Sequence, residues 1–168
     1  MMISRPETET ILGLDPGTHR TGYGVVERRG STIIPLDYGV IEFAGEAFGS
    51  TRSRGAPERL SELSRRVETL ITTYRPVAIG IETLYFSRNT TTGLAVSEAR
   101  GVLLMSAGSH RIPVFEYAPT SVKQRVTGYG KSDKRAVMKM VSLILGISSF
   151  SSLDDASDAL AVAIACAL

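Results

Sequence analysis

The segment that decides the fold is ILGLDPGTHRTGYGVVE, which runs from Ile11 to Glu27. Its apolar stretch, Ile11 to Leu14, leads directly into Asp15, and after a polar turn a second apolar stretch starts at Tyr23. This pattern predicts two strands joined by a glycine-rich turn. Because burying an isolated carboxylate is costly, Asp15 either starts the turn or holds a cation at the end of its strand.

The remainder of the chain alternates between apolar strands and helices with one apolar face. Further strands are predicted at residues 31–43, 77–81 and 113–117, and helices at residues 57–75, 90–109, 119–126, 133–145 and 155–168. Ser132 is the expected N-cap of the fourth helix. Three consecutive strands favour a meander, and the later alternation favours parallel pairing. The chain is therefore predicted to be an α/β protein with a five-stranded mixed sheet flanked by helices.

Composition and charge fit one soluble domain. The 168 residues are 43% hydrophobic and carry a formal net charge of only +2, so residues 1–168 are expected to form one domain, with residues 1–9 frayed. The start of the chain is polar, unlike a secretory signal, and no apolar run reaches the about 20 residues of a membrane span. The single cysteine, Cys166, excludes an intramolecular disulfide. We therefore expect a cytoplasmic protein with no membrane partner.

Four acidic residues occupy positions where carboxylates are unusual. Asp15 and Glu82 each end an apolar strand, and Asp155 and Asp158 share one face of an apolar helix. If the two strands are neighbours, the first turn of the helix can bring all four acids to one corner. Clustered carboxylates repel each other unless they are protonated or bound to metal, and oxygen ligands suit Mg²⁺ or Mn²⁺. Two such ions about 4 Å apart are a common arrangement for attack at a phosphodiester.

Three of these acids also have an ordinary structural explanation. Asp15 could simply favour a turn, and Asp155 and Asp158 could complement a helix N-terminus. Glu82 has no comparable structural role at the end of its strand. Two histidines and one cysteine are too few and too scattered for a zinc site, and the sequence contains neither a phosphate-binding P-loop nor a dinucleotide fingerprint.

Five motifs in order make the sequence recognisable: LGLDPGTHRTGYGV, IETLYFSRN, SEARGVLL, PVFEYAPTSVKQRVTGYGKSDK and DDASDALAVAIA. Over nearly the whole chain they closely resemble the RuvC family of Holliday junction resolvases. The resemblance implies a ribonuclease H-like fold and a homodimer that symmetrically nicks two strands of four-way junction DNA, in homologous recombination and DNA repair. It also implies hydrolysis to a 5′-phosphate and a 3′-hydroxyl, and cooperation with a branch-migration motor of the RuvA–RuvB type.

The resemblance assigns the catalytic and metal-binding roles to the four acids already singled out. Two Mg²⁺ or Mn²⁺ ions are expected in each active site, at the family positions that match Asp15, Glu82, Asp155 and Asp158. Some relatives carry histidine at the third of these positions. The small residues of the predicted helix at 90–109 make it our candidate for the dimer surface.

The resemblance also points to residues that contact DNA. Lys123 and Lys134 match basic family positions, and Arg125 and Lys131 belong to the same basic segment. The aromatic residue that stacks on a base near the crossover matches Tyr85, with Phe86 as its neighbour, although relatives commonly have phenylalanine there.

Two rival functions are consistent with part of the pattern. Sugar kinases and actin-like ATPases also open with a strand, an aspartate and a Gly-Thr turn, so an ATP-binding fragment is one alternative. Their two lobes need more than 168 residues. A catalytically idle junction-binding module is the other, but four retained acids would repel DNA if no metal were bound.

Overall fold

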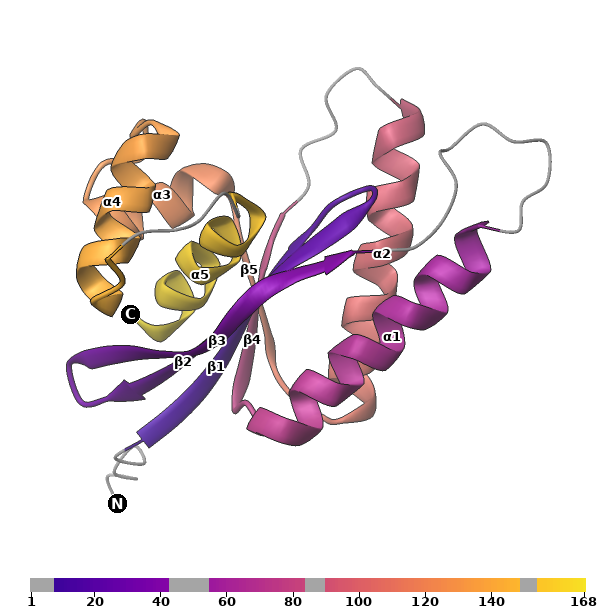
Figure 1. The fold of residues 1–168 in the computed structure, drawn as a ribbon. Coiled ribbons are helices and arrows are strands. Elements are labelled where there is room, and N and C mark those ends of the chain that lie inside the picture. Colours follow the sequence, from indigo (N-terminus) through magenta and orange to yellow (C-terminus); the bar gives the residue numbers. More distant parts are fainter. Residues whose placement is uncertain (1–7, 43–54, 84–89, 149–153) are drawn as a thin grey trace.

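The computed structural model describes residues 8–42, 55–83, 90–148 and 154–168 and shows one sheet covered by helices on both faces (Figure 1). The strands are β1 (Thr8–Pro16), β2 (Arg20–Arg29), β3 (Thr32–Glu42), β4 (Ala78–Glu82) and β5 (Val114–Tyr117). The helices are α1 (Gly55–Tyr74), α2 (Thr90–Ser109), α3 (Pro119–Thr127), α4 (Lys134–Leu145) and α5 (Asp154–Ala167). No helix in these described ranges is long and apolar enough to cross a membrane.

The five strands form one mixed sheet in the order β3-β2-β1-β4-β5. The first three strands form an antiparallel meander, whereas β4 pairs in parallel with β1 and β5 pairs in parallel with β4. This is the mixed sheet that the sequence predicts, and β1 lies at its centre. Parallel strands of this kind need both faces covered, and the helices supply that cover.

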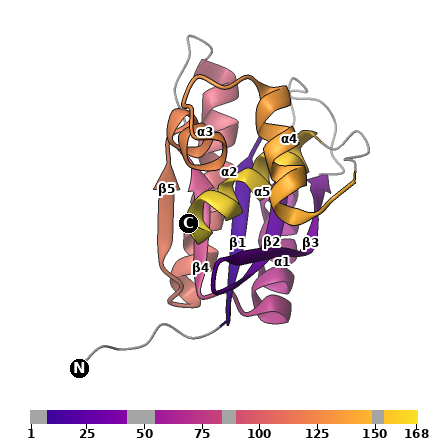
Figure 2. The ribbon, with the colours of Figure 1, turned by 90° about the vertical axis from the view of Figure 1, so that its left-hand side faces the viewer.

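Side-chain alternation along β1 divides the core into two halves. Leu12 and Leu14 face α1 and α2, in a cluster with Leu63 and Leu103. Ile11 faces the opposite way, into a cluster with residues of α3, α4 and α5. Figure 2 views the sheet from this second side, where α5 lies against the strands and α3 and α4 lie outside it.

The contact between α5 and the sheet depends on a row of glycines. Gly13 of β1 pairs with Gly24 of β2 on one side and with Gly80 of β4 on the other. A Cβ atom at Gly13 would lie 2.2 Å from the carbonyl oxygen of Ala159, far inside van der Waals contact. At Gly24 it would lie 2.9 Å from the Cα of Leu160. The row is therefore a trough in the sheet surface, into which the alanine-rich helix α5 fits.

Among the boundaries that differ from the sequence predictions, two have a clear physical reason. The N-cap of α4 is Asp133, not Ser132, because the Asp133 carboxylate accepts a hydrogen bond from the Ala136 amide at 2.8 Å. The Ser132 hydroxyl is instead 2.7 Å from the hydroxyl of Thr127. Strand β1 already begins at Thr8, so the predicted fraying of residues 8–9 is wrong, since Glu9 forms an ion pair with Arg28 of the neighbouring strand.

Candidate active site

The first two candidate acids lie side by side at the ends of neighbouring strands. Asp15 continues the face of β1 that carries Ile11 and Gly13, and that face is covered by α5. In the parallel β1–β4 pair Leu14 is opposite Ile81, so Asp15 and Glu82 follow as the next residues on adjacent strands. Both carboxylates therefore project from the same edge of the sheet toward α5.

The other two candidate acids reach this corner because α5 approaches the sheet closely. A Cβ atom at Gly22 of β2 would lie 2.1 Å from the carbonyl oxygen of Asp155, so only glycine permits this contact. Carboxylate oxygens of Asp15, Asp155 and Asp158 lie within 4.8 Å of one another. Glu82 is outside that group of three, but its charge acts on Asp15.

The electrostatics of the corner show carboxylates that lack enough positive charge. Burial, followed by the charges of Glu82, Asp158 and Asp155, raises the pKa of Asp15 to about 7. Burial and the charge of Asp158 also raise the pKa of Glu82, against the opposing charge of Lys123. A divalent cation would remove this repulsion, and an all-oxygen donor set suits a hard ion. The residues present therefore fit a Mg²⁺-type metal.

The four acids, Asp15, Glu82, Asp155 and Asp158, form what we call the acidic corner. Lysines from α3 and α4 line its other side. The Lys134 ammonium lies 3.1 Å from the Asp158 carboxylate. Lys123, Lys134, Glu82 and Asp158 all line one open hollow of about 210 Å³. Lys134 and Arg135 occupy the first turn of α4, where the helix dipole disfavours cations. The helix dipole therefore does not favour these cations, and Lys134 is stabilised instead by its ion pair with Asp158.

The remaining predicted DNA-binding residues are less uniform. The Arg125 guanidinium donates to the Ala165 carbonyl at 3.2 Å and lies over the Tyr117 ring, 5.3 Å from its centroid. Arg125 thus fastens α3 to the C-terminal part of α5. Lys131 is exposed between α3 and α4. Tyr85 and Phe86 lie outside the described residues.

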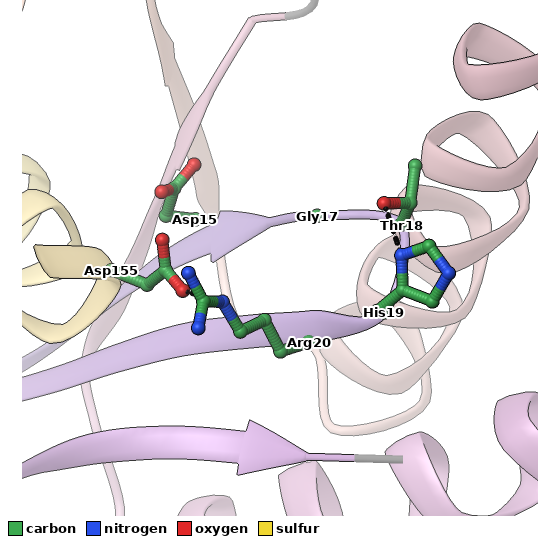
Figure 3. A pocket seen from close by; sticks show the side chains of 6 residues that line it. All are labelled: Asp15, Gly17, Thr18, His19, Arg20 and Asp155. Carbon is green, nitrogen blue, oxygen red and sulfur yellow. Dashed lines mark hydrogen bonds and ion pairs between the residues drawn. The ribbon is translucent and has the colours of Figure 1, made fainter. Parts of the chain in front are cut away.

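Sequence reasoning missed two arginines near the acidic corner. Arg20, at the start of β2, forms an ion pair with Asp155 (Figure 3). Arg20, Asp15 and Asp155 line a second hollow, of about 430 Å³, together with the turn that joins β1 to β2. Two strands joined by a short turn form a hairpin, so the residue after the turn returns to the end of the first strand. The observed register, with Thr21 opposite Pro16, places Arg20 there. The hairpin pattern could therefore have drawn attention to Arg20.

The second missed arginine is Arg59 of α1, which binds the backbone of the same turn. Its guanidinium donates to the Thr18 carbonyl at 2.9 Å and to the Glu98 carboxylate at 2.8 Å. Its side chain is only 11% exposed. Arg59 therefore ties the turn to both α1 and α2, and no local sequence signal marks this contact.

The central five-stranded sheet flanked by helices, with acids at the ends of β1 and β4 and on α5, defines a ribonuclease H-like protein whose acidic group could bind metal. The sequence profile of the family described as crossover junction endodeoxyribonuclease RuvC matches residues 11–166, and the chain belongs to that family. Nucleases of this family depend on metal ions.

Individual relatives agree with this assignment. Crossover junction endodeoxyribonuclease RuvC of Desulfitobacterium hafniense is 42% identical over 92% of this chain and 89% of the relative. The protein of the same name from Rubrobacter xylanophilus is 42% identical over 97% of this chain and 87% of its own length. Among solved structures, T. thermophilus RuvC in complex with Holliday junction substrate superimposes with a TM-score of 0.83 at 30% identity, covering 94% of this chain and 92% of that one. The ATP-binding fragment and the idle module are not favoured.

Proposed function

We propose that this protein resolves Holliday junctions by nicking two DNA strands symmetrically at the acidic corner. The observation that carries the proposal is the convergence of acids from β1, β4 and α5 beside the lysines of α3 and α4. A phosphodiester needs both parts, because cations hold its phosphate while metal-bound carboxylates act at the scissile bond. The resemblance of the fold to RuvC in complex with Holliday junction substrate supports the junction as the DNA form.

The catalytic group in this proposal consists of Asp15, Glu82, Asp155 and Asp158, which would hold two Mg²⁺ or Mn²⁺ ions. Metal bound there supplies Lewis-acid chemistry, which makes water a stronger nucleophile and stabilises the leaving 3′ oxygen. The protein itself contributes rigid placement, since Asp15 and Glu82 stand on paired strands and Asp155 and Asp158 on a helix seated in the sheet. The products expected are a 5′-phosphate and a 3′-hydroxyl.

The DNA-binding group in this proposal contains Lys123, Lys134, Arg125 and Lys131, together with Tyr85 or Phe86 as the stacking aromatic. Lys123 and Lys134 have the strongest support, because both line the hollow that also contains Glu82 and Asp158. Arg125 and Lys131 remain predictions from the basic segment. Phosphate contacts release counterions, so junction binding should weaken as salt rises.

The assembly in this proposal is a homodimer, because two symmetric nicks need two active sites related by a two-fold axis. Support comes from α2, where Leu94 is 61% and Met105 58% exposed. We further propose that this dimer binds the junction in the cytoplasm and works with a branch-migration motor of the RuvA–RuvB type. We also propose that residues 1–168 act as a single domain.

The test is cleavage of a synthetic four-way junction and of a linear duplex with the same sequence, each with Mg²⁺, with Mn²⁺ and with chelator. Paired, metal-dependent nicks on the junction alone are expected. Equal cutting of both substrates would remove the junction specificity.

Glu82→Gln is the matched variant, because it keeps the shape of the side chain and removes its charge. This variant should abolish cutting while keeping or improving junction binding. Undiminished cutting by Glu82→Gln would overturn the metal assignment.

A further inference from the structure

Arg20 is placed to act on both the acidic corner and the open space in front of it. It is the first residue of β2, directly after the turn, and its backbone carbonyl accepts a hydrogen bond from the Gly17 amide at 3.0 Å. The backbone of Arg20 is therefore fixed, whereas its side chain is 57% exposed. A fixed base and an exposed long side chain allow the guanidinium to reach more than one anion.

In the structure the guanidinium of Arg20 is engaged by a candidate metal ligand. Its Nε contacts Oδ2 of Asp155 (Figure 3). Asp155 is one of the three carboxylates whose oxygens lie within 4.8 Å of one another. A metal held by this group would bring two positive charges close to the guanidinium, so Arg20 and the metal compete for the same carboxylate.

Arg20 can release Asp155 only if its guanidinium binds another anion instead. Its guanidinium stays protonated in proteins, so it cannot leave Asp155 by losing its charge. A phosphate group is a matching alternative, because guanidinium binds phosphate with two parallel hydrogen bonds. The hollow of about 430 Å³ that Arg20 and Asp155 both line offers space for that phosphate beside Asp15.

We propose that Arg20 is an exchangeable counter-ion, which pairs with Asp155 in the free protein and passes to a DNA phosphate when substrate binds, releasing Asp155 to the metal. The inference rests on the proposed metal centre. Its consequence is that DNA and metal binding are coupled through one side chain. Metal affinity is held down until a backbone phosphate has entered the hollow.

The test measures two equilibria that the exchange moves in opposite directions. Mn²⁺ binding is measured by calorimetry without DNA, and junction binding is measured by fluorescence anisotropy in EDTA, where no cutting occurs. Arg20→Gln should bind Mn²⁺ about two- to fivefold more tightly, because an exposed ion pair changes an equilibrium constant by at most about fivefold. The same variant should bind the junction more weakly, with a salt slope lower by about 1.

Two control variants show whether the effects come from the charge at position 20 or from the loss of any arginine on β2. Arg20→Lys keeps the cation and should bind Mn²⁺ like the unsubstituted protein, but it should bind the junction somewhat more weakly because an ammonium cannot make the two parallel hydrogen bonds to phosphate. Arg29→Gln removes an arginine from the far end of the same strand, where Arg29 pairs with Glu27, and should leave both unchanged. Circular dichroism confirms that each variant is folded.

The outcomes distinguish this inference from the proposed metal centre. A lower Mn²⁺ affinity in Arg20→Gln would mean that Arg20 merely orients Asp155, and equal affinities in all variants would mean that it does not compete; either overturns the exchange. Mn²⁺ binding that survives Asp15→Asn in the otherwise unsubstituted protein would instead overturn the metal centre.

Discussion

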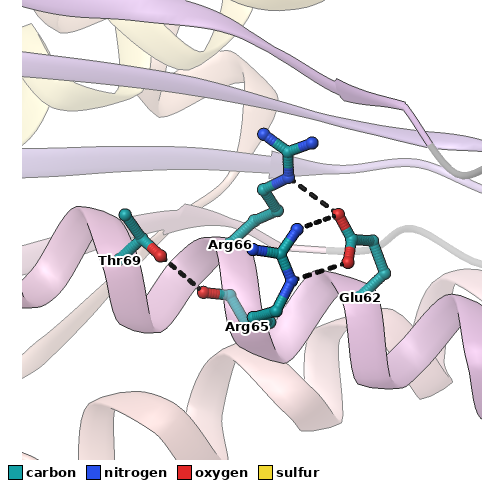
Figure 4. Close-up of polar contacts among 4 residues, drawn as sticks. All are labelled: Glu62, Arg65, Arg66 and Thr69. Atoms are coloured by element: carbon teal, nitrogen blue, oxygen red, sulfur yellow. Dashed lines mark hydrogen bonds and ion pairs between the residues drawn. The ribbon is translucent and has the colours of Figure 1, made fainter.

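Two carboxylates in this molecule have their acidity shifted in opposite directions. On the exposed surface of α1, Glu62 accepts hydrogen bonds from Arg65 at 2.6 and 2.9 Å and from Arg66 at 2.8 Å (Figure 4). These two arginines lower the pKa of Glu62 to about 2. At the acidic corner, burial and three neighbouring acids raise the pKa of Asp15 to about 7.

The charge of the Glu62 carboxylate is balanced by neighbouring cations, whereas that of the Asp15 carboxylate is not fully balanced. The surface of α1 balances its carboxylate with cations from the same helix, one turn away. The acidic corner draws acids from β1, β4 and α5, and nearby cations, among them Arg20, Lys123 and Lys134, compensate their charge only in part. A protein keeps such an imbalance where a ligand completes it, which makes the corner, and not α1, the candidate site.

The largest expected effect comes from removing the charge of Asp15. Asp15→Asn should lower the junction-cutting rate by about 100- to 1000-fold, the range for loss of one charge-stabilising group. It should also raise the melting temperature of the metal-free protein, because it relieves the repulsion among the acids. Single-turnover cleavage and thermal unfolding in EDTA measure the two effects.

Glu62→Gln is the control for Asp15→Asn. It should leave the cutting rate unchanged and should not raise the melting temperature. If Asp15→Asn cut the junction as fast as the unsubstituted protein, the acidic corner would be no better a candidate for the active site than the surface of α1.

The next effect concerns the frame that holds the acids. Gly13→Val should lower the free energy of unfolding by about 1–3 kcal/mol or more, because its side chain would meet the backbone of α5. Gly108→Ala, on α2, is the comparison, since no atom outside its own helix lies within 4 Å of the added Cβ. Urea denaturation measures both. Equal stability of Gly13→Val and the unsubstituted protein would contradict the seating of α5 in the glycine trough.

The pH dependence of stability should differ between the two carboxylates. The folded protein holds the Asp15 proton more tightly than the unfolded chain, since the pKa rises from 3.8 to about 7. The stability of the metal-free protein should therefore fall as pH rises through this window. Glu62 has the opposite sign, and its contribution is lost only as pH falls from 4.5 through about 2.

Urea denaturation in EDTA at pH 5, 6, 7 and 8 measures the slope, and Asp15→Asn should flatten it. A slope that persists unchanged in this variant would assign the titration to another group.

The smallest effect concerns the lysine that partly balances the corner. Lys134→Met should weaken junction binding and lower its salt slope by about 1, while protein stability changes little. Lys139→Met, on the exposed surface of the same helix, is the matched control. If the two variants had identical salt slopes, Lys134 would not be one of the residues that contact DNA phosphates.

The sequence allowed much of the fold to be predicted because its signals are local. Apolar runs marked every strand of the sheet, and prolines 57 and 76 bracketed α1 closely. The choice of Asp133 over Ser132 as N-cap could not be predicted, because both residues can cap a helix. Their roles were decided by the Thr127 hydroxyl, which contacts Ser132.

The candidate site was predictable where its residues share a strand end or a helix turn. Asp15 and Glu82 each end an apolar strand, and Asp155 and Asp158 are three positions apart. Arg59 could not be found in this way, because the Thr18 carbonyl that it holds is 41 positions away in the sequence. Contacts of that kind depend on how α1 packs against the sheet, which no local pattern encodes.

The glycine trough under α5 assigns the geometry and the chemistry of the corner to different residues. Gly13, Gly24 and Gly80 set the depth at which the helix lies, and none of them carries a functional group. The depth of the helix therefore does not depend on which side chains the first turn of α5 carries. A different side chain at the candidate position 155 is compatible with this packing, whereas a side chain at Gly22 beneath it is not.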